Sequence, residues 1–189
     1  MKKQNLNTRT LSFEHTKDTI LLANFSCGIE SIDDFIHSEL QDYVNMGGCE
    51  MVVVREDEQI VAMYCTDSLN LHISEAAKDK MIEGAKPMPT NAPEPDDFYW
   101  LKPFYDAVEI TYLAVDKNKQ HNHIGSFIVE HIISEIAENK SANCDFVAVR
   151  ALKCHDYTAV PFYSKCGFFA AEQEEPDRNL FMYRVIMRE

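Results

Sequence analysis

The chain has 189 residues, of which 46% are hydrophobic and 26% charged, a composition typical of a globular protein with one compact core. No apolar run approaches the roughly 18 residues of a membrane span, and the basic start lacks the apolar stretch of a signal peptide, so we expect a cytoplasmic protein. The formal net charge of -13 disfavours nucleic-acid phosphates and favours cationic partners.

The cysteines are scattered and form no C-x-x-C pair, so we expect reduced thiols that mostly lie in the core. A zinc site normally brings four ligands in recognisable spacings. His121 and His123 lie two residues apart in a polar stretch with no cysteine nearby. We therefore predict no metal site.

In chain order, apolar residues at helical spacing predict a first helix over about 32–44, with Ser31 and Asp34 as a capping box. The pair Gly47-Gly48 should end this helix. Two β-rich runs, 51–55 and 60–66, flank a short polar turn and predict a hairpin. Residues of about 70–103 form an irregular excursion that contains five of the seven prolines, with a short helix over 74–84.

The second half alternates strands and helices. It predicts a strand over 108–115, a helix over 124–139, a strand over 145–152, a short helix near 158–166 that ends at Gly167, and a last strand over 180–187. A strand–helix–strand unit normally lays its two strands parallel, with a right-handed crossover.

A polar turn lies between the strand 108–115 and the helix 124–139, with Gly125 at the helix entrance. The first backbone N–H groups of a helix lack intrahelical partners, and the helix dipole favours negative charge there. A turn that exposes these donors can hold a pyrophosphate, and a glycine permits close approach. The alternative is an ordinary connection with a glycine near the helix cap.

Two motifs resemble the GCN5-related N-acetyltransferases, abbreviated GNAT. The run QHNHIGS, Gln120 to Ser126, resembles the Q/R-x-x-G-x-G/A signature, and DYTAVPFYSKCGF, Asp156 to Phe168, resembles N-x-x-A-x-x-F-Y-x-K-x-G-F. Two departures are His123 in place of the first glycine and Asp156 in place of asparagine. The resemblance implies a mixed, largely antiparallel α/β sheet flanked by helices, with a parallel strand pair at the cofactor site, in one domain over 1–189.

The same resemblance implies acetyl-CoA as the acetyl donor. Strand 108–115 would pair with the pantetheine arm, and the turn would hold the pyrophosphate. The implied cofactor-binding residues are Leu113, Ala114, Val115, Gln120, His121, His123, Ile124, Gly125, Ser126 and Asp156.

Acetyl transfer to an amine needs a base for the ammonium and an acid for the thiolate. Glu109 matches the position of the catalytic glutamate of histone-acetylating members, and Tyr163 matches the family's tyrosine near the cofactor sulfur. Glu109 as a polar residue at a strand start and Tyr163 as a half-buried helix tyrosine remain the simpler alternatives. Cys166 lacks the histidine and acid partners of an activated nucleophile, so we expect a packed thiol.

The amino-terminal run FSCGIESIDDF, Phe25 to Phe35, resembles the F-x-C-G-x-x-x-L-D-x-F/W opening of the family's toxin-like branch, whose members acetylate aminoacyl-tRNA and pair with a small antitoxin. The net charge disfavours a tRNA acceptor, so we expect a cationic small molecule or a protein amine. A toxin-type aminoacyl-tRNA acetyltransferase and a non-catalytic acyl-CoA-binding module stay open as alternatives. A homodimer and an antitoxin partner are also left open.

Overall fold

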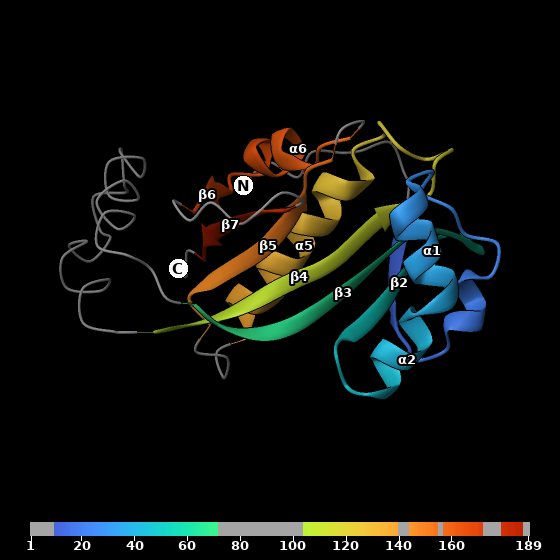
Figure 1. Cartoon of the computed structure of the whole chain (residues 1–189), viewed down its shortest axis with the longest axis horizontal. Helices are drawn as coiled ribbons and strands as arrows, with labels where there is room; N and C mark the ends of the chain where they lie inside the picture. Colours follow the sequence, from blue (N-terminus) through green and yellow to red (C-terminus); the bar gives the residue numbers. More distant parts are fainter. Residues whose placement is uncertain (1–9, 72–103, 140–143, 155–156, 172–178, 187–189) are drawn as a thin grey trace. The chain divides into compact units, whose positions relative to one another are not determined.

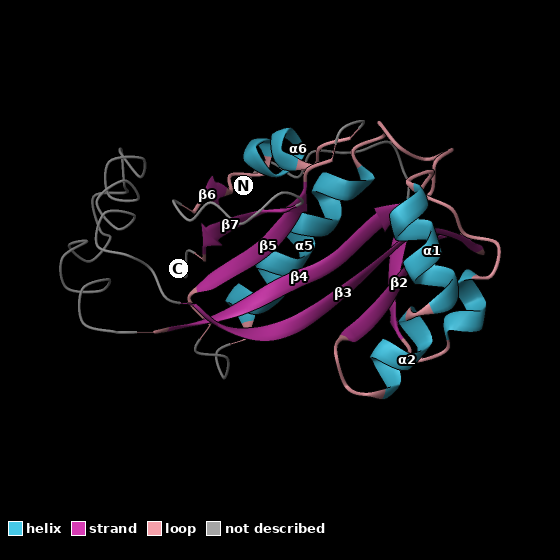
Figure 2. Cartoon of the chain, in the orientation of Figure 1, coloured by secondary structure: helices cyan, strands magenta, loops and turns pink. Residues whose placement is uncertain are grey.

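The computed structural model describes residues 10–71, 104–139, 144–154, 157–171 and 179–186. The chain forms two compact units, the first from residues 1–67 and 110–132 and the second from 68–109 and 133–189. The strands follow the order β1-β2-β3-β4-β5-β7-β6 in one sheet, and their labels and types are given in Figures 1 and 2. Strands β3 and β4 and helix α5 each contribute residues to both units.

The sheet of the first unit is built by antiparallel pairing. Strand β1 (Leu11–His15) pairs with β2 (Glu50–Glu56), and β2 pairs with β3 (Gln59–Leu71). Asp57 adopts a positive φ of 53° in the two-residue turn between β2 and β3, a conformation that tight hairpin turns require and that Asp tolerates. The predicted hairpin is confirmed, and the edge strand β1 was not predicted.

One face of this sheet carries the main core of the first unit. Its strand residues include Met51, Val53, Met63, Cys65 and Ala114, all buried. A 3-10 helix (Thr19–Leu22) and helices α1 (Glu30–Ser38) and α2 (Leu40–Asn45) supply the remaining apolar residues of this core. The ring of Tyr43 on α2 lies where a Cβ on Gly48 would come within 2.6 Å of it, so a glycine is required at this position.

The predicted first helix is therefore two helices, separated at Glu39, where φ is -119°. The predicted capping box is wrong. The N-cap of α1 is Ile29, which makes no side-chain cap bond. Asp33 instead accepts hydrogen bonds from the segment that precedes the helix. Gly47, with φ of 76°, follows α2 as predicted.

The first turns of helix α5 (Ile124–Glu138) cover the other face of the first unit's sheet. Phe13 on β1 stacks on His131 with ring centroids 3.7 Å apart and lies 6.4 Å from the ring of Phe127. Ile128, Val129 and Ile132 are buried. These contacts hold the start of α5 firmly, because its apolar side chains are packed against the strands.

The second unit contains the remaining strands. Strand β5 (Phe146–Leu152) pairs antiparallel with β7 (Asn179–Val185), and β7 pairs with the short β6 (Phe169–Ala170). Strand β4 (Tyr105–Val115) is the parallel neighbour of β5. An aromatic group of Tyr105, Phe146 and Tyr183 anchors the core of this unit.

The predicted mixed sheet with one parallel strand pair is confirmed, as are the elements around it within a few residues. The predicted short helix is α6 (Val160–Lys165), which is followed by Gly167 with φ of 80°. The predicted helix over 74–84 and most of the proline-containing excursion lie outside the described residues. Among the described helices, none is long and apolar enough to cross a membrane.

Candidate functional site

The turn between β4 and α5 is a compact loop that is held by its own polar groups. The backbone N–H groups of Lys119 and Gln120 donate to the carbonyl of Asp116 at 2.8 and 3.1 Å. The Asp116 carboxylate accepts from the backbone and side-chain nitrogens of Asn118 at 2.8 and 3.1 Å. The start of the turn is fixed to β3, because Asp116 N–H donates to the carbonyl of Val61.

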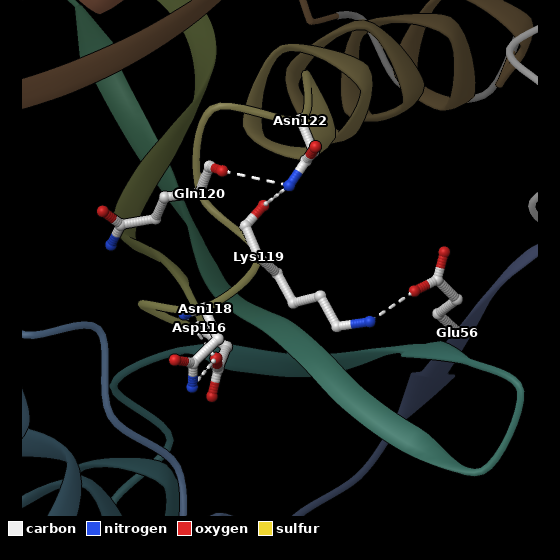
Figure 3. Close-up of polar contacts among 6 residues, drawn as sticks. All are labelled: Glu56, Asp116, Asn118, Lys119, Gln120 and Asn122. Atoms are coloured by element: carbon white, nitrogen blue, oxygen red, sulfur yellow. Dashed lines mark hydrogen bonds and ion pairs between the residues drawn. The ribbon is translucent and has the colours of Figure 1, made fainter.

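Two further side chains brace the turn (Figure 3). The amide of Asn122 donates to the carbonyls of Lys119 and Gln120, both at 3.1 Å. The ammonium of Lys119 lies 2.7 Å from a carboxylate oxygen of Glu56, whose side chain is only 13% exposed. The turn is thus ordered without any ligand.

The end of the turn carries backbone donors toward solvent. His121 and His123 adopt left-handed φ values of 62° and 61°, and both side chains are exposed. The carbonyl of His123 accepts from Phe127 N–H and Ser126 Oγ. The N–H groups of Ile124, Gly125 and Ser126 belong to the first turn of α5, where no intrahelical acceptor exists. No acidic residue lies in that first turn, so an anion would meet no competing carboxylate there.

His123 occupies the position of the first signature glycine and adopts the conformation that a glycine adopts most easily. The departure therefore keeps the path of the backbone, at a cost of about 1–2 kcal/mol for a left-handed residue with a Cβ.

The side chain of Gln120 differs from the prediction. Its amide nitrogen donates to the carbonyl of Cys27 at 2.7 Å and to that of Val115 at 3.1 Å. Figure 3 shows this side chain extending away from Asn122. The side chain of Gln120 is thus directed at the backbone of the protein, and the Val115 carbonyl has an intramolecular partner.

In the second unit, Glu109 is a buried acid on β4, with 7% of its surface exposed. One of its carboxylate oxygens pairs with the guanidinium of Arg150 on β5. Arg150 also lies over the ring of Phe181, 5.7 Å from its centroid. The sequence gave no reason to single out Arg150, which lies 41 residues from Glu109.

Tyr163, also in the second unit, is buried on α6 between the rings of Phe162 and Phe168, at centroid distances of 4.9 and 5.4 Å. Burial raises the pKa of its hydroxyl well above the ordinary value, and the nearby Tyr157 and Cys166 add to this shift. The group therefore stays protonated at neutral pH and can act only as a proton donor or a hydrogen-bonding group.

The structure brings most of the predicted cofactor-binding residues together in the first unit, from Leu113 to Val115 and from Gln120 to Ser126. Glu109 and Tyr163 both belong to the second unit. Asp156 lies outside the described residues. Within the described ranges no group of three or more His, Cys, Asp or Glu is placed to hold a metal ion. Glu56 and Arg150 were missed because both act through partners distant in the sequence.

Comparison with known proteins identifies the domain. Residues 93–169 match the family model of the acetyltransferase (GNAT) domain. No curated protein shows significant sequence similarity to the chain.

Similar solved structures include AtaTR bound with AcCoA, with 18% identity, a TM-score of 0.68 and coverage of 93% of this chain and 94% of that chain. AtaT complexed with acetyl-methionyl-tRNAfMet has 18% identity, a TM-score of 0.63 and coverage of 92% and 95%. The KacTA-DNA complex has 16% identity, a TM-score of 0.63 and coverage of 94% of both chains. The resemblance to this family and to its toxin-like branch is confirmed. The chain carries a GNAT acetyltransferase domain on a GNAT fold.

Proposed function

We propose that the protein is a cytoplasmic N-acetyltransferase that transfers an acetyl group from acetyl-CoA to a primary amine. The observation that carries this proposal is the ordered turn from Asp116 to His123, which ends at the uncapped N–H groups of α5. Such a helix terminus stabilises a bound phosphate through direct donors and through the helix dipole.

The chemistry of the turn fits a pyrophosphate. The first turn of α5 offers N–H donors and no acidic side chain, and the exposed His121 and His123 add polar groups at its rim. Leu113, Ala114 and Val115 at the end of β4 would pair with the pantetheine arm. The residues proposed to hold the pyrophosphate are His121, His123, Ile124, Gly125 and Ser126, with Asp156 as a further contact.

In the reaction, the amine nitrogen forms a bond to the acetyl carbon, the C–S bond breaks, and the sulfur leaves as a thiolate. We assign Glu109 as the base that takes the proton from the ammonium, directly or through a water. We assign Tyr163 as the acid that protonates the sulfur. The burial of Glu109 and the protonated state of Tyr163 support these assignments, because each group must hold its charge state until the reaction occurs.

The acceptor is a second question. The formal net charge of -13 favours a cationic small molecule or a protein amine. A specific observation favours aminoacyl-tRNA as the second candidate, since a similar solved structure is AtaT complexed with acetyl-methionyl-tRNAfMet. The same neighbours support a possible antitoxin partner, because KacTA is a complex with DNA and AtaTR is bound with AcCoA.

The test of the cofactor site is thermal stabilisation. A ligand that binds only the folded state at 100 times its Kd adds about 2.7 kcal/mol to stability, so acetyl-CoA should raise the Tm of the wild-type protein. Gly125→Val should abolish this rise, because a branched side chain blocks the approach of the phosphate. A wild-type Tm that stays constant at millimolar acetyl-CoA would contradict the proposed site.

Binding alone would fit a non-catalytic acyl-CoA-binding module. Mass spectrometry separates the two functions, because an acetyltransferase adds 42 Da, about the mass of one acetyl group, to an offered amine and releases CoA. Stabilisation by acetyl-CoA with no acetyl transfer to any amine, including aminoacyl-tRNA, would favour the binding module.

A further inference from the structure

The side chain of Gln120 is committed to two backbone carbonyls. Its amide nitrogen lies 2.7 Å from the oxygen of Cys27 and 3.1 Å from that of Val115. Because both partners are acceptors, the NH₂ end of the amide must face them, and both of its hydrogens are used. In this arrangement Gln120 has no side-chain donor left for a phosphate.

The segment Ser26–Gly28, which receives one of these bonds, is held from two sides. The turn holds it through Gln120 and through Lys117, whose N–H donates to the carbonyl of Ser26 at 2.9 Å. Gly28 has φ of 79°, and a Cβ there would lie 3.6 Å from the Cβ of Lys117. A residue other than glycine would therefore be strained at this close contact.

On the other side, Asp33 in the first turn of α1 binds the same segment. Its carboxylate accepts from Ser26 Oγ at 2.7 Å, from Cys27 N–H at 2.8 Å and from Gly28 N–H at 3.1 Å. Burial by itself would raise the pKa of Asp33, but these hydrogen bonds outweigh burial and lower it. Asp33 is thus a charged acceptor that ties α1 to the segment.

These contacts form one chain of hydrogen bonds within the first unit, from α1 through Asp33 and Ser26–Gly28 to Gln120 and the turn. Helix α1 is in turn fixed to β4, because Phe35 stacks on Tyr112 with ring centroids 3.9 Å apart and planes 6° apart. The position of the backbone donors at the start of α5 therefore depends on contacts that lie outside the turn.

We infer that Gln120 is a positioning residue and that Ser26–Gly28 couples the turn to helix α1. This inference rests on the proposed acetyl-CoA site. Gln120 holds the turn in the shape in which the N–H groups of α5 face the pyrophosphate, and Asp33 supports it from the other side. By linkage, a bound cofactor restrains Ser26–Gly28 and the start of α1.

The test measures the Kd of acetyl-CoA by calorimetry for Gln120→Met, Asp33→Asn and the double variant, at a temperature where circular dichroism shows all of them folded. Each single variant should weaken binding about fivefold to tenfold, the effect of losing one or two net hydrogen bonds. The double variant should weaken binding by less than the product of the single effects, because both changes break the same chain of contacts.

A matched control is Gln41→Met. The amide nitrogen of Gln41 also donates twice, to the carbonyl of Lys17 at 3.3 Å and to Asn45 Oδ1 at 3.1 Å, in the same unit but without a contact to the turn. Its loss should leave the Kd unchanged. A second measurement is hydrogen exchange with saturating acetyl-CoA, which should protect the amides of Cys27 and Gly28 in the wild type and much less in Gln120→Met.

The outcomes separate the alternatives. If Gln120→Met weakens binding while Asp33→Asn does not, or if the two effects multiply, Gln120 is a direct phosphate ligand and the inference is wrong. If the wild type binds and both variants bind equally well, the coupling does not exist. If the wild type itself does not bind acetyl-CoA, the proposed function fails instead.

Discussion

At the scale of single residues, the two proposed catalytic groups are set by opposite kinds of environment. Tyr163 lies among aromatic rings, which disfavour its charged form and keep the hydroxyl protonated. Glu109 is equally buried, but it has a cationic partner in Arg150. A buried neutral acid and a buried paired carboxylate are suited to give and to take a proton, respectively.

For Tyr163, deletion of the hydroxyl should separate catalysis from binding. Tyr163→Phe should lower kcat by ~10²–10⁴-fold, the usual contribution of a general acid, with little change in the Kd of acetyl-CoA. Steady-state kinetics and calorimetry measure the two quantities. Tyr105→Phe, which removes the hydroxyl of another buried tyrosine of the same unit, is the control. Weaker cofactor binding with an intact kcat would make the Tyr163 hydroxyl an anchor and not an acid.

For Glu109, the informative measurement is the pH profile of kcat/KM. Glu109→Gln should lower the rate by ~10²–10⁴-fold, and most at low pH, because unassisted loss of the ammonium proton is hardest there. Asp145→Asn changes the other buried acid of the described residues and should leave the shape of the profile unchanged. An equal loss for Glu109→Gln at all pH values would favour a structural role in the pair with Arg150.

At the scale of elements, the turn between β4 and α5 holds backbone strain in two histidines. A left-handed φ at His123 is unfavourable for any residue with a Cβ and most unfavourable for a branched one. It persists because the bonds from Asn122 and to Asp116 determine the path of the turn.

Substitution of His123 should therefore follow backbone preference. His123→Gly should retain the rise in Tm that acetyl-CoA causes, while His123→Val should lower the free energy of unfolding by ~1–3 kcal/mol and reduce that rise. Thermal unfolding with and without acetyl-CoA checks both. Asp57→Val strains the other left-handed turn, with φ of 53°, and should destabilise the protein without changing ligand binding. Loss of binding in His123→Gly would assign the imidazole itself to the phosphate.

The elements that the sequence predicted are those with strong local patterns. Helix α5 and strand β4 each have an apolar pattern of one clear period, and the position of the turn between them follows from both. Strand β1 has only Leu11 and Phe13 as apolar residues and lies at the edge of the sheet, so its signal is weak. The break at Glu39 between α1 and α2 has no glycine or proline to indicate it.

The parts of the site that were not predicted depend on contacts between distant residues. The amide of Gln120 binds a carbonyl 93 residues away, and Lys119 pairs with a glutamate 63 residues away. A motif identifies the residue type at such a position, but only the fold decides whether the side chain faces a ligand or the protein. Asp33 illustrates the same point, since its spacing from Cys27 and Gly28 suits a cap that no helix signal contains.

At the scale of the whole molecule, stability should decline in alkaline solution. Burial raises the pKa of the Cys27 thiol to about 11 and raises the pKa of Tyr163 further above its ordinary value. A raised pKa contributes stability that is complete below the unfolded-state pKa, about 9 for the thiol and about 10 for the phenol, and is lost as the pH rises above it.

The Tm should thus be nearly constant from pH 7 to about 9 and fall above that value. Circular dichroism under reducing conditions measures it. The Cys27→Ala, Tyr163→Phe double variant should start from a lower Tm and show a smaller fall over the same range. A double variant whose Tm falls as steeply as that of the wild type would assign the alkaline transition to other groups.

The net charge of -13 also bears on the acceptor. A field of this sign draws cationic amines toward the protein, and added salt screens it, since the Debye length shortens from about 10 Å at 0.1 M to about 3 Å at 1 M. For a lysine-rich peptide acceptor, kcat/KM should fall by at least about tenfold between low and high salt, whereas a neutral amine of similar size should show little change. A tRNA acceptor would need local cationic surface, and its binding would weaken with salt as well, so salt dependence alone does not separate the two. The deciding assay incubates the protein with bulk aminoacyl-tRNA, or with the peptide, and acetyl-CoA at equal concentrations and compares the acetyl groups transferred to each. We expect transfer to the peptide; efficient acetylation of aminoacyl-tRNA would instead establish the toxin-type reaction and show that a local surface overrides the net charge.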